Sequence, residues 1–222
     1  MQPILFLNFK LFEEGTGSKA VSLAKLCERA ASETNSKIVL VVQPTELSLI
    51  ASKTRLDVFS QHLDGIDFGS SVGKILPEAV KRAGAKGAIV NHAAFKVSNE
   101  HVQKAVARAK QVGLKLMVCA ETTERAVEVA VFGPDFIAIE PPELIGGTVS
   151  VSTAKPQIIS EAVKAIQKVD KKIKVITGAG IKTTDDVRKA IELGTAGVFV
   201  SSGIVKAKNQ KKALKEILAG FK

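Results

Sequence analysis

The chain has no tryptophan and no tyrosine, only two cysteines and only three histidines among its 222 residues. Nucleic-acid readers usually stack bases on aromatic rings beside clustered basic side chains. Here the lysines are scattered along the chain, with no tyrosine or tryptophan to interleave with them, so no nucleic-acid partner is expected. Cys27 and Cys119 stand far apart and fit no metal-ligand spacing. Because Met1-Gln2-Pro3 leads straight into a short apolar run without a basic leader, we expect no secretory signal, and reduced, buried thiols in a cytoplasmic protein.

Long apolar runs are also missing. None approaches the ~20 residues that a membrane-spanning helix needs, so no membrane partner is expected. Apolar residues still make up 45% of the chain, enough to bury one core, and the length predicts a single domain over residues 1–222. The net charge of +10 is spread along the sequence, as on solvated helix faces, and a positive field favours capture of an anionic phosphate ester.

Short β-branched segments alternate eight times with longer amphipathic ones. Several, such as KIVLVVQ and AGVFVS, are continuously apolar, which is typical of parallel strands covered on both faces. The predicted strands are Ile4–Phe9, Lys37–Gln43, Asp57–Leu63, Ala88–His92, Lys115–Ala120, Phe136–Glu140, Lys174–Gly178 and Gly197–Ser201.

The segments between these strands carry the signals of helix ends. Ser98 and Thr183 each precede an amphipathic stretch that closes on a glycine, as helix caps require. Shorter helices are predicted around Thr45–Lys53 and Pro77–Gly84. Eight regular units without a break in composition predict an α/β fold, a (β/α)8 barrel. An open doubly wound sheet is the alternative, but no G-x-G-x-x-G follows the first strand.

Polar side chains stand where three of the predicted strands stop. The first ends in Asn8-Phe9-Lys10, the fourth in Asn91-His92 and the sixth in Glu140. Taken singly, Lys10 could reach out to solvent, His92 could be hydrogen-bonded near the core, and Glu140 could pair with a lysine. In a barrel, however, the ends of the strands meet at one mouth, where catalytic residues come from several strands. The joint pattern favours a catalytic site.

The last two predicted strands run into small-residue turns, Gly178–Ile181 and Ser201–Ile204. Two tight turns are the plain interpretation. The loops after strands seven and eight are, however, the usual phosphate site of such barrels, and a short helix beginning at Ser202 would direct its positive end toward an anion. We therefore expect Gly180 and residues 201–203 at a phosphate.

A long segment follows Glu140. It opens with Pro141 and Pro142, has an apolar middle, and contains Gly146 and Gly147. It could be an ordinary long loop, but loops of this length in compact domains are usually functional. We expect a hinged lid that keeps water away from a reactive intermediate.

Several of these segments together resemble one family, the triosephosphate isomerases, in their short archaeal form, a single-domain TIM barrel. The matching segments are LNFK, SQHLD at Ser60–Asp64, IEPPELIGGTVSVSTAKP at Ile139–Pro156, TGAGIKTTDDV and SSGIVKA. The resemblance spans essentially the whole chain. The lid segment is highly specific, whereas the phosphate loops are shared with many barrels.

The resemblance implies roles for the residues at the strand ends. Glu140 would remove a proton from carbon, a neutral His92 would polarise the carbonyl, and Lys10 would supply positive charge. Asn8 would position Lys10 and the substrate, a small phosphorylated triose. Neither a metal nor an organic cofactor is implied. The residues implied to line the substrate or its phosphate are Asn8, Lys10, Ile145, Gly180, Ser201, Ser202 and Gly203.

The sequence departs from the family pattern at two places. Ala93 and Ala94 stand where the family usually has Ser and Glu, and Val72 stands where a Thr usually reaches the neighbouring subunit. We expect an isomerase of weakened activity, and a homodimer or homotetramer that docks through residues 69–73. An epimerase, lyase or synthase acting on another phosphate ester, or a non-catalytic phosphate-binding barrel, are the alternatives.

Overall fold

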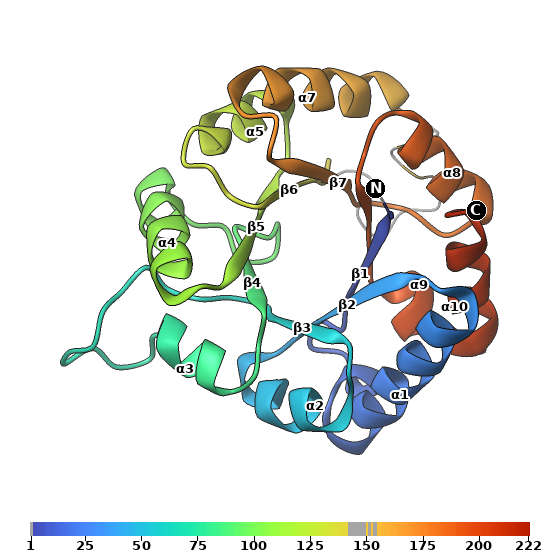
Figure 1. Cartoon of the computed structure of the whole chain (residues 1–222), viewed down its shortest axis with the longest axis horizontal. Coiled ribbons are helices and arrows are strands. Elements are labelled where there is room, and N and C mark those ends of the chain that lie inside the picture. The colour runs from blue at the N-terminus through green and yellow to red at the C-terminus, as the bar shows by residue number, and fades with distance from the viewer. Residues whose placement is uncertain (1, 142–149, 151, 153–154) are drawn as a thin grey trace.

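The computed structural model describes residues 2–141, 150, 152 and 155–222. Its centre is a closed barrel of parallel strands in chain order, with the helices outside it (Figure 1). Pairing of Ile4 with Gly197 closes the barrel between its first and last strands. The predicted (β/α)8 barrel is therefore confirmed and the open sheet is wrong. The strands are β1 (Ile4–Asn8), β2 (Lys37–Val42), β3 (Asp57–Ser60), β4 (Gly87–Val90), β5 (Lys115–Ala120), β6 (Phe136–Ile139), β7 (Lys174–Thr177) and β8 (Gly197–Val200).

Capping residues mark the ends of several helices. Ser98 and Thr183 accept hydrogen bonds from the first turns of the helices that they precede, and Gly113 ends one helix in the left-handed conformation. None of the described helices is long and apolar enough to cross a membrane. The α-helices are α1 (Gly17–Thr34), α2 (Leu47–Lys53), α3 (Pro77–Arg82), α4 (Asn99–Val112), α5 (Thr123–Ala130), α7 (Pro156–Val169), α8 (Thr184–Glu192), α9 (Ser202–Val205) and α10 (Gln210–Ala219).

The predicted element ends need correction. Every strand except β5 ends before the predicted residue, and β3 stops at Ser60 rather than Leu63. The hydroxyl of Ser60 donates to the His62 carbonyl at 2.6 Å, which turns the chain out of the sheet. The helix expected at Thr45–Lys53 begins as a 3-10 turn over Pro44–Glu46. Lys10, His92 and Glu140 therefore follow the strands, whereas Asn8 is the last residue of β1.

Alternating side chains of the strands fill the barrel interior. Phe6, Phe59 and Phe136 meet edge to face there, with ring centroids 5.1–6.4 Å apart. The other phase of each strand packs against the helices in a second, larger core. Cys119 lies inside the barrel and Cys27 between barrel and helices, and both are buried and free, as expected. The inward phase matters because it continues into the barrel mouth.

Candidate active site

One hollow at the carboxyl ends of the strands collects most of the predicted site residues. It brings together groups from β1, β4, β6, β7 and β8 that stand up to about 190 residues apart in the chain. The described residues that line it are Asn8, Lys10, His92, Glu140, Ala179, Gly180, Ile181, Lys182, Phe199, Val200, Ser201, Ser202 and Gly203. The expected convergence at one mouth is therefore what the structure shows, while the roles of the residues remain predictions.

The end of β1 is held in an uncommon backbone conformation. Lys10 has a φ of 49°, in the left-handed region that costs a side-chain-bearing residue free energy. The Lys10 N–H donates to Asn8 Oδ1 at 3.0 Å. Gln61 Nε2 donates to the same oxygen at 3.2 Å and to the Lys10 carbonyl at 3.0 Å. Gln61 thus fixes the turn that carries Lys10 into the hollow.

His92 is held as a neutral imidazole. Its Nδ1 accepts the Ala94 backbone N–H at 3.1 Å, so in the neutral ring the proton is on Nε2. Burial, with the positive charge of Lys10 adding to it, lowers the pKa of His92 to about 4. At neutral pH the ring therefore has one N–H to donate.

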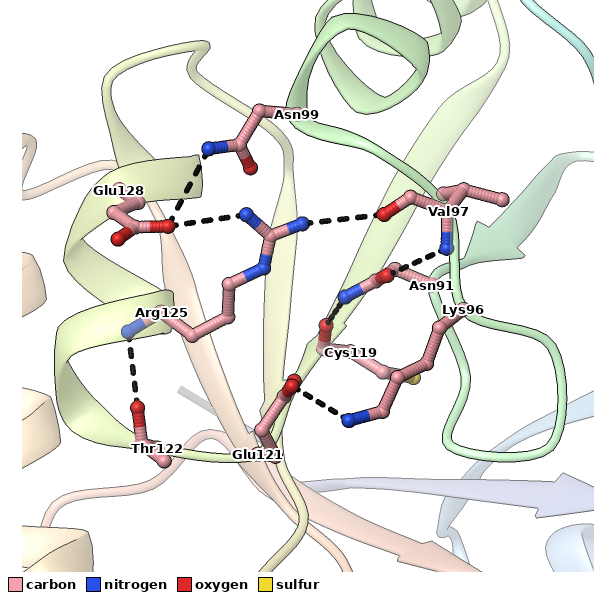
Figure 2. Close-up of polar contacts among 9 residues, drawn as sticks. All are labelled: Asn91, Lys96, Val97, Asn99, Cys119, Glu121, Thr122, Arg125 and Glu128. Carbon is pink, nitrogen blue, oxygen red and sulfur yellow. Dashed lines mark hydrogen bonds and ion pairs between the residues drawn. The ribbon is translucent and has the colours of Figure 1, made fainter.

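Hydrogen bonds and an ion pair hold the loop that carries His92 (Figure 2). Asn91, with a φ of 60°, donates through Nδ2 to the Cys119 carbonyl at 2.8 Å and accepts from the Val97 N–H at 3.0 Å. Lys96 Nζ lies 2.7 Å from the Glu121 carboxylate. These contacts anchor the loop although Ala93 and Ala94 carry no polar side chain.

Glu140 is a buried carboxylate at the mouth of the barrel. The inward phase of β6, which includes Phe136 and Ala138, carries on to it, and it is only 6% exposed. Burial raises the pKa of Glu140 to about 7, although a hydrogen bond from the Cys119 thiol and the charge of Lys10 act in the opposite direction. Its Oε2 has no hydrogen-bond partner among the described residues. Such a carboxylate is matched to proton transfer near neutral pH.

Gly178 makes room for that carboxylate. A Cβ at residue 178 would lie 2.8 Å from both Cγ and Oε1 of Glu140, closer than real Cβ atoms approach. Gly178 follows β7 in the inward phase set by Ile176. A side chain at this position would therefore displace Glu140.

Another wall of the hollow is made of small residues after β7 and β8. Ala179 and Gly180 have φ values of 69° and 76°, and α9 begins at Ser202. The Ser201 hydroxyl is buried and has no hydrogen-bond partner among the residues that the structure describes. This wall stands where barrels of this kind bind phosphate.

The predicted lid is only partly described. Pro141 is buried directly after Glu140, whereas Pro142, Ile145, Gly146 and Gly147 lie outside the described residues. At the far end of the segment the Ser152 hydroxyl donates to the Asp186 carbonyl at 2.9 Å.

Sequence reasoning missed three residues that support this site: Cys119, Gln61 and Gly178. Cys119 was expected to be a small core residue, yet its thiol contacts Glu140. Its position two residues after the inward Met117 could have indicated this. Gly178 was grouped with the phosphate turn, although its neighbour is the carboxylate. Gln61 gave no signal beyond its place in the family-like segment.

A closed (β/α)8 barrel whose mouth holds a buried carboxylate, a neutral imidazole and a lysine defines a class, the barrels that perform acid–base chemistry on small anionic substrates. Residues 3–219 match the sequence model of one protein family, triosephosphate isomerase. The chain is 41% identical to a triosephosphate isomerase of Methanothermus fervidus over 98% of both chains, and 42% identical to one of Methanobacterium bryantii over 98% of this chain and 96% of that one. The chain belongs to the triosephosphate isomerase family.

A solved structure supports the fold independently. The crystal structure of a triosephosphate isomerase from Bartonella henselae matches with a TM-score of 0.76 at 18% identity, over 99% of this chain and 97% of that one. At that identity the likeness concerns the barrel rather than the chemistry.

Proposed function

We propose that the chain is a triosephosphate isomerase that interconverts glyceraldehyde 3-phosphate and dihydroxyacetone phosphate through an enediolate. Family membership supports the reaction. Two opposed pKa shifts in one hollow support this reaction in the present chain. The pKa of Glu140 is raised to about 7, and the pKa of His92 is lowered to about 4. A carboxylate ready to take a proton and an imidazole ready to donate one are what moving a proton between adjacent carbons requires.

In the proposed reaction, Glu140 takes the proton from the carbon beside the carbonyl. His92 Nε2–H donates toward the carbonyl oxygen, where negative charge develops, and the Lys10 ammonium stabilises the same charge. Glu140 then returns its proton to the former carbonyl carbon, while the hydroxyl proton of the adjacent carbon passes through His92 to the former carbonyl oxygen, so that the carbonyl and the hydroxyl exchange places. Asn8, whose Oδ1 accepts from the Lys10 N–H, keeps that lysine in place.

The phosphate would lie against the wall of small residues. Gly180, Ser201, Ser202 and Gly203 line that side of the hollow, and the backbone N–H groups at the start of α9 suit an anion. Ile145 is proposed to cover the substrate, and a lid built on Pro141, Pro142, Gly146 and Gly147 is proposed to exclude water.

Ala93 and Ala94 support a reduced rate in this proposal. The family's carboxylate at the second position is missing, and a loosely supported site loses rate even when its catalytic residues are present. The anchoring of the loop through Asn91 and Lys96 argues that His92 itself stays in place. A non-catalytic phosphate-binding barrel is therefore the second candidate, and turnover separates it from the first.

Assembly and location are also proposals. The segment between β3 and α3 extends away from the barrel in Figure 1. Val72, which belongs to this segment, is 91% exposed. Phe68 on the same segment and Leu11 beside the site are exposed as well. Apolar side chains of this size suit a contact between copies, so we propose a homodimer or homotetramer in the cytoplasm that docks through residues 69–73.

Turnover tests the proposal. The purified chain should convert glyceraldehyde 3-phosphate to dihydroxyacetone phosphate, and Glu140→Gln should lose this activity while keeping the shape of the pocket. Tight binding of a phosphate-bearing enediolate mimic without turnover would support the non-catalytic candidate. Neither turnover nor binding would refute the isomerase proposal.

A further inference from the structure

Three metal-ligand side chains meet outside the hollow described above. His62 and Asp64 follow β3, and His101 lies in the first turns of α4. One oxygen of Asp64, Oδ1, lies 3.6 Å from His62 Nε2 and 4.0 Å from His101 Nε2. The three ligand atoms all lie within 4.8 Å of one another. Two of the chain's three histidines are therefore in this cluster.

The Asp64 carboxylate is held in place by the backbone. Its Oδ2 accepts the Ile75 N–H at 2.7 Å, and the Asp64 N–H donates to the Ile75 carbonyl at 2.9 Å. This pair of bonds closes the base of the segment between β3 and α3. Because Oδ2 is engaged, Oδ1 is the oxygen that faces the two imidazoles.

The two imidazoles suit a shared cation. Their rings are stacked with centroids 5.3 Å apart and an interplanar angle of 24°. His101 Nε2 is buried and has no hydrogen-bond partner among the described residues. A metal ion binds the neutral form of an imidazole, which leaves one ring nitrogen free to act as a ligand.

We propose that His62, Asp64 and His101 bind one divalent transition-metal ion of the zinc class. Two imidazole nitrogens and one carboxylate oxygen are a ligand set that such ions accept, with solvent completing the coordination. Bonds of ~2.0–2.1 Å in a tetrahedral site put ligand atoms ~3.3 Å apart, so the cluster needs to close by less than ~1.5 Å. A hollow of about 650 Å³ beside His62 and Asp64 gives water access.

Lys74 pairs with the same carboxylate oxygen that the metal ion would bind. Its Nζ lies 3.4 Å from the same Asp64 Oδ1, and its side chain is 53% exposed, so it can move out to solvent. A metal ion and this ammonium compete for one oxygen. Bound metal would therefore release Lys74 and join the segment between β3 and α3, which extends outward in Figure 1, to α4.

The test uses the full chain without a histidine tag, freed of metal and titrated with Co²⁺. We expect one equivalent to bind with a visible d–d absorption band that Zn²⁺ displaces. His101→Gln should weaken Co²⁺ binding more than ~100-fold, because loss of a ligand costs at least as much as loss of a group that orients one. His92→Gln is the matched control, since it removes the third histidine and should leave the titration unchanged. Far-ultraviolet circular dichroism confirms that both variants fold.

Lys74→Met should tighten Co²⁺ binding by about two- to fivefold, the gain expected when a partly exposed competing ion pair is removed. This second variant keeps all three ligands, so its effect does not depend on how well the histidine variants fold. Absence of a Co²⁺ band in the wild-type chain would overturn the proposal. A titration that His101→Gln leaves unchanged would also overturn it, because the ion would then be bound elsewhere.

Discussion

Replacing Gly178 with alanine places a methyl group against the catalytic carboxylate proposed for this chain. The new Cβ would lie 2.8 Å from Glu140 Cγ and Oε1, and ordinary contact begins at 3.4 Å, so the carboxylate must move by about 0.6 Å. Glu140 is buried and cannot swing aside freely. Since a misplacement of ~1 Å can cost ~100-fold in rate, we expect kcat to fall ~10- to 100-fold.

The assay is steady-state isomerisation of glyceraldehyde 3-phosphate by both proteins, with thermal unfolding measured in parallel. Overpacking of this kind costs ~1–3 kcal/mol of stability, so a folded variant is expected. Gly69→Ala is the control, because nothing lies within 4 Å of a Cβ there and its φ is ordinary. If Gly178→Ala keeps kcat within ~3-fold of wild type, the contact between Gly178 and Glu140 does not position the base, and the reasoning is wrong.

Four further predictions concern Glu140 and the groups around the site. Below the pKa of Glu140, about 7, kcat/KM should fall about tenfold per pH unit because the base becomes protonated. Protonation of His92 should add no further change until the pH approaches about 4. A flat profile between pH 4 and pH 7 would contradict this. The raised pKa of Glu140 adds to the free energy of unfolding at low pH. This contribution is complete below pH 4.5, the ordinary pKa of the group, and is lost as the pH rises through about 7. Glu140→Gln should therefore stabilise the chain above that pH, by on the order of 3 kcal/mol in denaturant titrations, and not at pH 4. Because the Cys119 thiol lowers the pKa of Glu140, Cys119→Ala should move the acid limb of the rate profile to higher pH; a shift to lower pH would contradict it. Ala94→Glu places a carboxylate beside the hollow that Lys10 also lines, and should raise kcat because a better supported site holds its catalytic residues more precisely. An unchanged kcat would show that the alanine is tolerated.

The barrel could be predicted from the sequence because its signals are local and repeat. Apolar β-branched runs such as Lys37–Val42 alternate with helices capped by residues such as Ser98 and Thr183, and regular βα units with short connections favour closure. The same logic placed Asn8, Lys10, His92 and Glu140 at one mouth, since parallel strands all end on the same side.

The supporting contacts could not be predicted, because they join side chains that are distant in the chain. No local pattern tells that Gly178 faces Glu140 or that Gln61 donates to Asn8 and to the Lys10 carbonyl. The strand ends were misplaced for a related reason. Leu63 is apolar and buried like the residues of β3, but a hydroxyl-to-carbonyl hydrogen bond at Ser60 turns the chain before it.

The central claim is that Glu140 moves a proton on a triose phosphate, and isotope exchange tests it most directly. Dihydroxyacetone phosphate is incubated with the chain in D₂O and followed by proton nuclear magnetic resonance. The account predicts deuterium on the carbon beside the carbonyl, at a rate that Glu140→Gln abolishes. Exchange that survives in Glu140→Gln would contradict the role of that carboxylate, and a wild-type chain that binds the phosphate mimic without any exchange would contradict the isomerase itself.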